Sequence, residues 1–545
     1  MKRRAVIIGL AFVLVVAACG DDDTRPTSTE TEKTDSTDRP ANLAPYPAGV
    51  VDAYVEGCTA DGDRAFCECT IELFQAEIPL DDFLDLVDAD LLAEPRVVDI
   101  MEACLAPTSA TTTPTAESST TVATEFTPIA DIDTSVAITV ADLDIFWADR
   151  LDAVYGVTYE TVAAYGPYFV SQGDEPRCGG PLRPQDYEQN AFYCGFDDTI
   201  QWDQEGLMQP LFDEFGDFVV PLVLAHEWGH AVQARFGFES SLATIVSELQ
   251  ADCFAGAWTG RVARNESDLI RLEPGDLEEA MAGFLLIGDQ LGTAPGGPSA
   301  HGGSFDRLNA FFDGFRNGVE SCSTYESTPP QVIFIPLAEG DDPIEGGDLA
   351  LVDTVPTLTA ALDVFWQFVY PDVFGEAWVP IGRSIPYRPS DPASLPTCGG
   401  EQLAFEFYDG NVFYCAADDY LAWDDEGLIP DLHTTIGDFA VGLVIGNEWA
   451  AAVQTRAGLA TSGNDAELQA DCLTGVWTAA LLIEDNPMQL FLSAGDLEEG
   501  IAGFLALSGD PDSGFAADDA AFQRFAAFQA GFFGGVDSCG LSLAG

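Results

Sequence analysis

The sequence predicts an α+β protein, mainly helical, in which two tandem domains follow a small disulfide-bonded helical module. Three observations support this fold class. A series of short motifs occurs twice in the same order, an apolar run precedes residue 226 as in a buried helix, and twelve cysteines other than Cys19 fall into three groups of four. With 545 residues, 47% of them apolar, the chain is long enough to bury several cores.

Residues 1–19 have the composition of an export signal. A charged start, Lys2-Arg3-Arg4, precedes an apolar run at 5–16 that is too short to remain in a membrane as a spanning helix. The end of this segment, Val16-Ala-Ala-Cys19, resembles a bacterial lipobox. That resemblance implies cleavage before Cys19, lipidation of Cys19 and anchoring to the extracytoplasmic face of the membrane. An ordinary signal peptide cut near Ala18 is the alternative, and it also exports the protein.

Three segments precede the duplicated region. Residues 20–45 are rich in Asp, Thr, Ser and Pro, which predicts a disordered linker. Residues 46–105 show helical apolar spacing and predict a small module stabilised by four cysteines of open connectivity: Cys58, Cys67, Cys69 and Cys104. Residues 106–133 are rich in Thr and Ser and predict a second linker.

The remainder of the chain is an internal duplication. Residues 134–324 are the first repeat and residues 355–545 the second repeat, with a linker at 325–354. They share the motifs Phe-Tyr-Cys, Glu-Leu-Gln-Ala-Asp-Cys and Gly-Asp-Leu-Glu-Glu, which begin at 192, 248 and 275 in the first repeat and at 413, 467 and 495 in the second. Two copies of one sequence pattern predict two copies of one fold.

Each repeat contains four cysteines at closely matching separations. The first two are 16 residues apart in one repeat and 17 in the other, and the last two are 69 and 67 apart. This parallel suggests that the first pairs with the second and the third with the fourth. The predicted disulfides are Cys178–Cys194, Cys253–Cys322, Cys398–Cys415 and Cys472–Cys539. Zinc coordination by these cysteines is the alternative, but wide spacing in an exported chain favours disulfides.

The segment His226-Glu-Trp-Gly-His230 has the spacing of a helical metal site. Residues four apart lie on one helical face, so both imidazoles can bind one zinc ion while Glu227 faces a water molecule on that ion. Glu248 is the predicted third ligand. Asp252 shares a helical face with Glu248 and is placed to orient a ligand imidazole.

The second repeat has lost all three histidines of the first. The replacements are Asn447 for His226, Ala451 for His230 and Asp518 for His301. Without imidazoles the second repeat cannot form a tetrahedral catalytic zinc site, so we expect one zinc ion per chain and an inactive second repeat. Glu467 and Asp471 persist there without histidines, which indicates that part of the Glu-Leu-Gln-Ala-Asp-Cys motif is structural. A structural role is therefore the alternative for Glu248.

Four motifs of the first repeat resemble, in order, those of a bacterial family, the "putative neutral zinc metallopeptidases". They are His226-Glu-Trp-Gly-His-Ala-Val-Gln233, Glu248-Leu-Gln-Ala-Asp-Cys253, Gly275-Asp-Leu-Glu-Glu279 and His301-Gly-Gly-Ser-Phe-Asp-Arg307. The resemblance spans roughly residues 140–324. It implies two tandem zincin-like metallopeptidase domains, the second degenerate. It also implies zinc ligands and a general base in the first: His226, His230 and Glu248 as ligands and Glu227 as the base.

Together these patterns predict a membrane-anchored, extracytoplasmic peptidase that hydrolyses a peptide or protein substrate with a zinc-activated water. His301 is the candidate for stabilising the tetrahedral intermediate, with a structural hydrogen bond as its alternative role. A non-catalytic binding or scaffold lipoprotein of the cell envelope is the alternative function, and hydrolysis of a non-peptide amide is a third. We expect the second repeat to dock on the first, because it keeps the features of a packed fold.

The net charge of the chain is −70, from 91 acidic and 21 basic residues. This balance argues against nucleic-acid binding, which depends on contacts of Lys and Arg with phosphates. The acidic excess is spread along the chain and favours a solvated surface. Recognition of cationic peptides and a halophilic habitat are the alternatives.

Overall fold

The computed structural model describes residues 131–541, apart from 240, 298–299, 339, 343–345 and 509–519. The described residues are mainly helical and contain two small sheets, in agreement with the predicted α+β class. Four predictions lie outside them: the signal segment with Cys19, the linker 20–45, the four-cysteine module 46–105 and most of the linker 106–133. None of the described helices combines the length and the hydropathy of a bilayer-spanning segment.

The first repeat begins with α5 (Ile132–Tyr155), two residues before the predicted boundary, because Asp131 caps this helix by accepting a hydrogen bond of 2.8 Å from the Thr134 amide. Three strands follow, with short helical turns around them: β1 (Ala164–Tyr168), η2 (Val170–Gln172), η3 (Pro184–Asp186), β2 (Ala191–Cys194), β3 (Thr199–Asp203) and η4 (Gln204–Met208). The remaining helices are α6 (Gln209–Phe215), α7 (Val219–Phe236), α8 (Thr244–Ala263), α9 (Asp276–Ile287), α10 (Ser304–Asn317) and α11 (Val319–Cys322).

The second repeat shows a closely similar order of elements. It begins with α12 (Leu351–Phe374), four residues before the predicted boundary. The strands and the short helix between them are β4 (Ser384–Tyr387), α13 (Phe405–Tyr408), β5 (Val412–Cys415) and β6 (Tyr420–Asp424). The helices that follow are α14 (Leu428–Thr435), α15 (Asp438–Ala457), α16 (Asn464–Ala480), α17 (Asp496–Leu507) and α18 (Ala520–Ser538).

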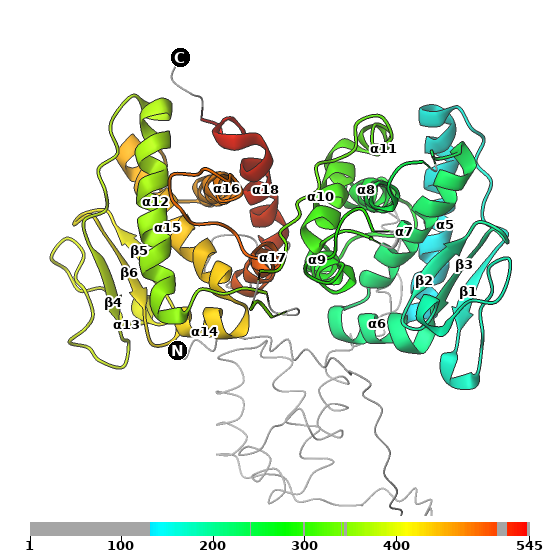
Figure 1. The fold of residues 1–545 in the computed structure, drawn as a ribbon, viewed down its shortest axis with the longest axis horizontal. Coiled ribbons are helices and arrows are strands. Elements are labelled where there is room, and N and C mark those ends of the chain that lie inside the picture. Colours follow the sequence, from blue (N-terminus) through cyan, green and yellow to red (C-terminus); the bar gives the residue numbers. More distant parts are fainter. Residues whose placement is uncertain are drawn as a thin grey trace, which may run out of the picture. The chain divides into compact units, whose positions relative to one another are not determined.

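Both three-stranded sheets have the same topology (Figure 1). In the first, β3 is central and pairs in parallel with β1 and in antiparallel with β2, which places Pro167 opposite Trp202 and Phe192 opposite Gln201. In the second, β6 is central, with β4 parallel and β5 antiparallel to it. One edge of each sheet is therefore β2 or β5. These strands pack against α7 and α15, respectively.

Helix α7 is the central element of the first repeat: β2 and α5 pack on it, as does α8, and α8 in turn packs on α10 (Figure 1). Glycines allow α8 and α10 to approach closely. A side chain at Gly256 would collide with the backbone of α10, and one at Gly314 with the backbone of α8. Gly475 and Gly531 occupy the same positions between α16 and α18. This close packing fixes the distance at which α10 can reach side chains of α8.

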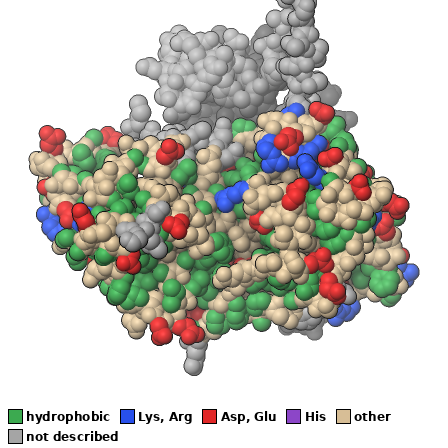
Figure 2. All heavy atoms as spheres, turned by 90° about the horizontal axis from the view of Figure 1, so that it is seen from above, with side chains coloured by type: hydrophobic (Ala, Val, Ile, Leu, Met, Phe, Trp, Pro, Cys, Tyr) green, Lys and Arg blue, Asp and Glu red, His purple; other side chains and the backbone are tan. Residues whose placement is uncertain are grey.

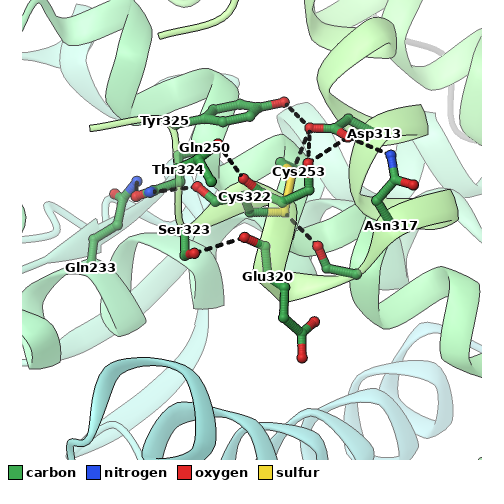
Figure 3. Close-up of a disulfide and its surroundings, with 12 residues drawn as sticks. Gln233, Gln250, Cys253, Asp313, Asn317, Glu320, Cys322, Ser323, Thr324 and Tyr325 are labelled. Atoms are coloured by element: carbon green, nitrogen blue, oxygen red, sulfur yellow. Dashed lines mark hydrogen bonds between the residues drawn. A yellow bond between two sulfur atoms is a disulfide. The ribbon is translucent and has the colours of Figure 1, made fainter. Parts of the chain in front are cut away.

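Four disulfides occur in the described residues, with the pairing that the sequence separations predict: Cys178–Cys194, Cys253–Cys322, Cys398–Cys415 and Cys472–Cys539. Figure 3 shows the surroundings of the second one, which ties α8 to α11. There the Gln250 amide donates to the Cys322 carbonyl at 3.0 Å. Gln469 donates to the Cys539 carbonyl at the same distance in the second repeat. The glutamine of the Glu-Leu-Gln-Ala-Asp-Cys motif is therefore structural in both copies.

Aromatic side chains line the contact between the two repeats. Phe312 of α10 stacks on Phe522 of α18 with 4.3 Å between ring centroids, and the Phe305 and Phe532 centroids are 5.0 Å apart. The two phenylalanines of α10 are buried. Arg316 also donates to the Ala526 carbonyl at 3.0 Å. Aromatic pairs of this kind stabilise a contact beyond the area that they bury.

Acidic side chains are distributed over the surface. On the face drawn in Figure 2, Asp and Glu side chains occur in small groups among apolar and neutral ones and do not form one continuous patch. Several of the few Lys and Arg side chains on this face lie close to one another. Screening by salt acts strongly on such exposed, separated charges.

Candidate metal centre

Helix α7 carries the two histidines through the interior of the first repeat. From Val219 to Gln233 all of its side chains are buried except that of His230, which is partly buried. The apolar run before His226 forms this helix as predicted, and Gly237 ends it in a left-handed conformation with φ of 82°. His226 and His230 lie one above the other on the same face, with ring centroids 4.8 Å apart.

Helix α8 brings Glu248 to the histidines, and Gly229 between them permits the approach. A Cβ atom at position 229 would lie 2.9 Å from the Cα atom of Ala251, a distance that real contacts do not show. In the second repeat Ala450 stands at this position. The glycine of the histidine motif is therefore tied to the metal centre, because it sets the spacing between the two helices that carry the ligands.

Gly229→Ala is expected to push α8 away from α7 and to displace Glu248. Overpacking of this kind costs about 1–3 kcal/mol. We expect a lower melting temperature and weaker zinc retention, measured by thermal unfolding and by competition with a chelator. The reverse change at the matching place, Ala450→Gly, is the control and should leave zinc retention unaltered. Equal zinc retention in Gly229→Ala and the wild type would contradict the proposed role.

The three predicted ligands converge. The Nε2 atoms of His226 and His230 each lie 3.4 Å from Oε2 of Glu248. That oxygen is buried and has no hydrogen-bond partner in the described residues. A buried carboxylate oxygen without a partner is unfavourable, and a cation between the three atoms would satisfy it. The residues present therefore fit a zinc ion held by two imidazoles and one carboxylate.

Asp252 orients His226, as the sequence predicts, and it is itself held by Arg307. His226 Nδ1 lies 2.7 Å from Asp252 Oδ1, so a proton on Nδ1 leaves Nε2 free to bind metal. Arg307 of α10 donates from Nε to Oδ2 and from Nη2 to Oδ1 of Asp252, both at 2.9 Å. Arg307 is 4% exposed, and its Nη1 donates to the Ile287 carbonyl. Through this bidentate pair Arg307 holds the Asp252 carboxylate, which in turn orients the His226 imidazole.

Gln233 orients the imidazole of His230 in the same way. His230 Nδ1 lies 2.8 Å from Gln233 Oε1, which also accepts from the Ser247 hydroxyl at 2.9 Å. The amide nitrogen of Gln233 donates to the Ser247 carbonyl and to Gln250 Oε1. Since Oε1 can only accept, it selects the tautomer of His230 with the proton on Nδ1 and the lone pair on Nε2.

The charges of the centre are strongly coupled. Burial alone would raise the pKa of Glu248, but the imidazoles of His230 and His226 hold this pKa well below its usual range. Burial also opposes the charged form of His226, yet Asp252 and Glu248 raise the pKa of His226 to about 10. The carboxylates of Glu248 and Asp252 are thus anionic, and a cation competes with a proton for the Nε2 atom of His226.

Glu227 of α7 is buried, at 6% exposure. Burial, followed by the carboxylates of Asp203 and Glu227, raises the pKa of Tyr168 at the end of β1. The Tyr168 hydroxyl donates to the carbonyl groups of Tyr187 and Asn190.

The structure does not bring His301 into contact with the three ligands. Its side chain is 53% exposed, and Nδ1 lies 3.4 Å from Asp289 Oδ1. The same aspartate accepts from the backbone amides of His301 and Gly302 at 2.9 Å. These contacts match the structural alternative for His301, and a catalytic role for it stays a prediction.

The second repeat keeps the supporting residues without the metal-binding ones. Asn447 Nδ2 donates to Asp471 Oδ1 at 2.8 Å, and Arg524 donates to both oxygens of Asp471 at 2.9 Å. Glu448 accepts from the Tyr414 amide at 2.7 Å, and burial together with the nearby charge of Glu467 raises the pKa of Glu448 to about 7. Within the described residues, no group with metal-ligand spacing occurs at this place.

Sequence reasoning missed Arg307, Gln233 and Gln250 as parts of the centre. Each lies in a quoted motif and recurs in the second repeat, as Arg524, Gln454 and Gln469. Their recurrence in the second repeat could have identified these residues from the sequence. It indicates that they stabilise the fold as well as the site.

Two imidazoles and a carboxylate from adjacent helices fit the ligand set of a His2Glu centre of the zinc metallopeptidase type, and Glu227 directly follows the first histidine. Comparison with known proteins agrees: residues 115–325 match the family described as "putative neutral zinc metallopeptidase". This segment therefore matches that family, in agreement with the resemblance seen in its four motifs.

Curated relatives match this region only in part. The uncharacterized protein YpfJ of Escherichia coli (strain K12) is 34% identical over 157 residues, which cover 25% of this chain and 53% of the relative. The uncharacterized protein Rv2575 of Mycobacterium tuberculosis is 31% identical over 170 residues, 26% of this chain and 58% of the relative. The chain thus spans little more than half the length of these relatives. No solved structure matches it significantly.

Proposed function

We propose that the first repeat is a zinc-dependent peptidase domain and that lipidated Cys19 anchors the chain at the extracytoplasmic face of the membrane. One observation carries the catalytic proposal: Oε2 of Glu248 is buried without a hydrogen-bond partner, 3.4 Å from the Nε2 atoms of both histidines. A structural zinc site would close the fourth position with a protein ligand and would need no glutamate beside it.

When bound, zinc supplies a Lewis acid that polarises the scissile carbonyl and acidifies a water molecule. The chain's own residues transfer the proton and orient the imidazoles. Glu227 accepts the proton of the attacking water and passes it to the leaving amine. Asp252 and Gln233 hold the two imidazoles in the tautomer that leaves Nε2 free.

The free edge of β2 supports a peptide as the substrate. In the described residues β2 pairs only with β3, and it packs against α7. An extended peptide can add to such an edge through main-chain hydrogen bonds. The second repeat indicates how close this strand lies to the glutamate of the helix. There the Tyr414 amide on β5 donates a hydrogen bond to the carboxylate of Glu448.

The second repeat serves as a non-catalytic partner that docks on the first. The ring contacts of Phe312 with Phe522 and of Phe305 with Phe532 support this role, because they keep large apolar side chains of α10 out of water. The buried contact of Glu448 with Tyr414 supports inactivity, since it occupies the group that corresponds to the general base.

The test is zinc analysis combined with a peptide library. The purified chain is expected to hold one zinc ion and to cleave library peptides, with both properties lost in His230→Ala, because two ligands rarely retain zinc. Ala451→Gly in the second repeat is the matched control and should change neither. Full zinc content with no cleavage of any library peptide would contradict the peptidase and favour the scaffold function.

A further inference from the structure

A second cluster of acidic side chains lies in the second repeat, away from the residues that correspond to the zinc site. It consists of Asp348 in the segment before α12, Asp438 at the start of α15 and Glu499 in the first turn of α17. One carboxylate oxygen from each lies within 4.8 Å of the others. Asp438 and Glu499 are each only about 6% exposed.

Backbone contacts hold these carboxylates in place. Glu499 Oε2 accepts from the Phe439 amide at 2.8 Å, and Asp438 Oδ2 accepts from the Leu349 amide at 2.7 Å. Gly437, with φ of 141°, leaves the room that the Glu499 carboxylate occupies, since a Cβ atom there would collide with it. The cluster is thus assembled by three segments that are distant in the sequence.

One carboxylate oxygen of this cluster has no hydrogen-bond partner among the described residues. This oxygen is Glu499 Oε1, which is buried, although the other oxygen of the same carboxylate is bonded. In this respect it resembles Glu248 Oε2 of the zinc centre. A buried oxygen without a partner, on a carboxylate that belongs to a cluster of three, indicates a missing positive ligand.

The charge balance leads to the same conclusion. The buried aspartates Asp142, Asp252 and Asp471 are each paired with an arginine, whereas no arginine of the described residues pairs with Asp438 or Glu499. In the acidic cluster burial comes first, followed by repulsion from Asp496, Asp438 and Asp348, in raising the pKa of Glu499 to about 10. Burial, together with repulsion from Asp348, also raises the pKa of Asp438 to about 6, although the hydrogen bond from the Leu349 amide opposes this rise. Such groups must be neutralised by protons or by a cation.

We propose that Asp348, Asp438 and Glu499 bind one calcium ion. The ligands are all hard oxygen atoms, which suit calcium and disfavour zinc. Oxygen atoms that share a calcium ion at 2.3–2.6 Å lie at most about 5 Å apart, which the cluster satisfies. The ion would join the segment before α12 to the N-terminal ends of α15 and α17. It would thereby stabilise the second repeat independently of the zinc centre.

The first repeat provides a matched comparison. Asp217, Asp276 and Glu279 form an equivalent group, in which Glu279 accepts from the Phe218 amide at 2.9 Å. Only Asp276 of these three is buried, whereas in the second repeat Asp438 and Glu499 are both buried and Asp348 is exposed. We therefore assign the ion to the second repeat.

The experiment uses the full chain, freed of metal and reloaded with one equivalent of zinc. Calcium chloride is titrated by calorimetry, and thermal unfolding is followed with and without millimolar calcium. We expect one calcium ion per chain and a rise in melting temperature on the order of 5 °C. Asp438→Asn should remove both effects, and Asp217→Asn should retain them.

The sign of the mutational effect separates a cation from shared protons. Without calcium, Asp438→Asn should melt at or above the wild-type temperature, because it removes a repelling buried charge. With calcium the order should reverse. If calcium neither binds nor changes the melting temperature, or if Asp217→Asn abolishes binding while Asp438→Asn retains it, the calcium site in the second repeat is refuted.

Discussion

Glu227→Gln is expected to lower kcat/KM for peptide cleavage by about a hundred- to ten-thousand-fold while the chain retains its zinc. The amide is nearly isosteric with the carboxylate but cannot accept the proton of the attacking water, and general-base catalysis contributes about this factor. The ligands His226, His230 and Glu248 are untouched by the change. Steady-state kinetics on a cleaved library peptide, together with zinc analysis, measure both quantities.

Glu448→Gln is the matched control for this variant. Glu448 occupies the same place in the second repeat, where it accepts from the Tyr414 amide. We expect wild-type cleavage from it, because an amide oxygen can keep that hydrogen bond. Full activity of Glu227→Gln would show that another group accepts the proton, and loss of zinc from this variant would show that Glu227 is a ligand.

Asp252→Asn is expected to weaken zinc binding about 10- to 100-fold and to destabilise the first repeat by about 3–5 kcal/mol. Asp252 carries two functions: it orients His226 at 2.7 Å and neutralises the buried Arg307. The neutral amide leaves the guanidinium without its charge partner and weakens the hydrogen bond that fixes the imidazole. Zinc affinity is measured against a competing chelator, and stability by denaturant unfolding.

Asp471→Asn separates the two functions of this aspartate. Asp471 pairs with Arg524 in the second repeat with the same geometry but contacts Asn447 where the first repeat has a histidine. We expect it to destabilise the second repeat by a similar amount without changing zinc affinity. If Asp252→Asn costs stability but binds zinc as the wild type does, the orientation of His226 by Asp252 is not needed for binding.

Local periodicity allowed much of the zinc centre to be predicted. The positions of His226 and His230 on one helical face follow from their spacing alone, because four residues make about one helical turn. The same rule correctly placed Glu248 and Asp252 together on a second helix. Spacing could not place His301, because it lies in a loop after glycines, where no helical period applies. The structure shows that it contacts Asp289.

The sequence by itself determined the α+β class, the helices that carry the ligands and the pairing of the four described disulfides. Each of these depends on local spacing or on comparison of the two repeats. Only the tertiary structure decided which side chains support them: Arg307 reaches Asp252 because glycines let α10 pack closely on α8. It also assembled Asp348, Asp438 and Glu499 from three distant segments. Burial, hydrogen bonding and charge pairing at these sites depend on distances across the fold, which no local pattern contains.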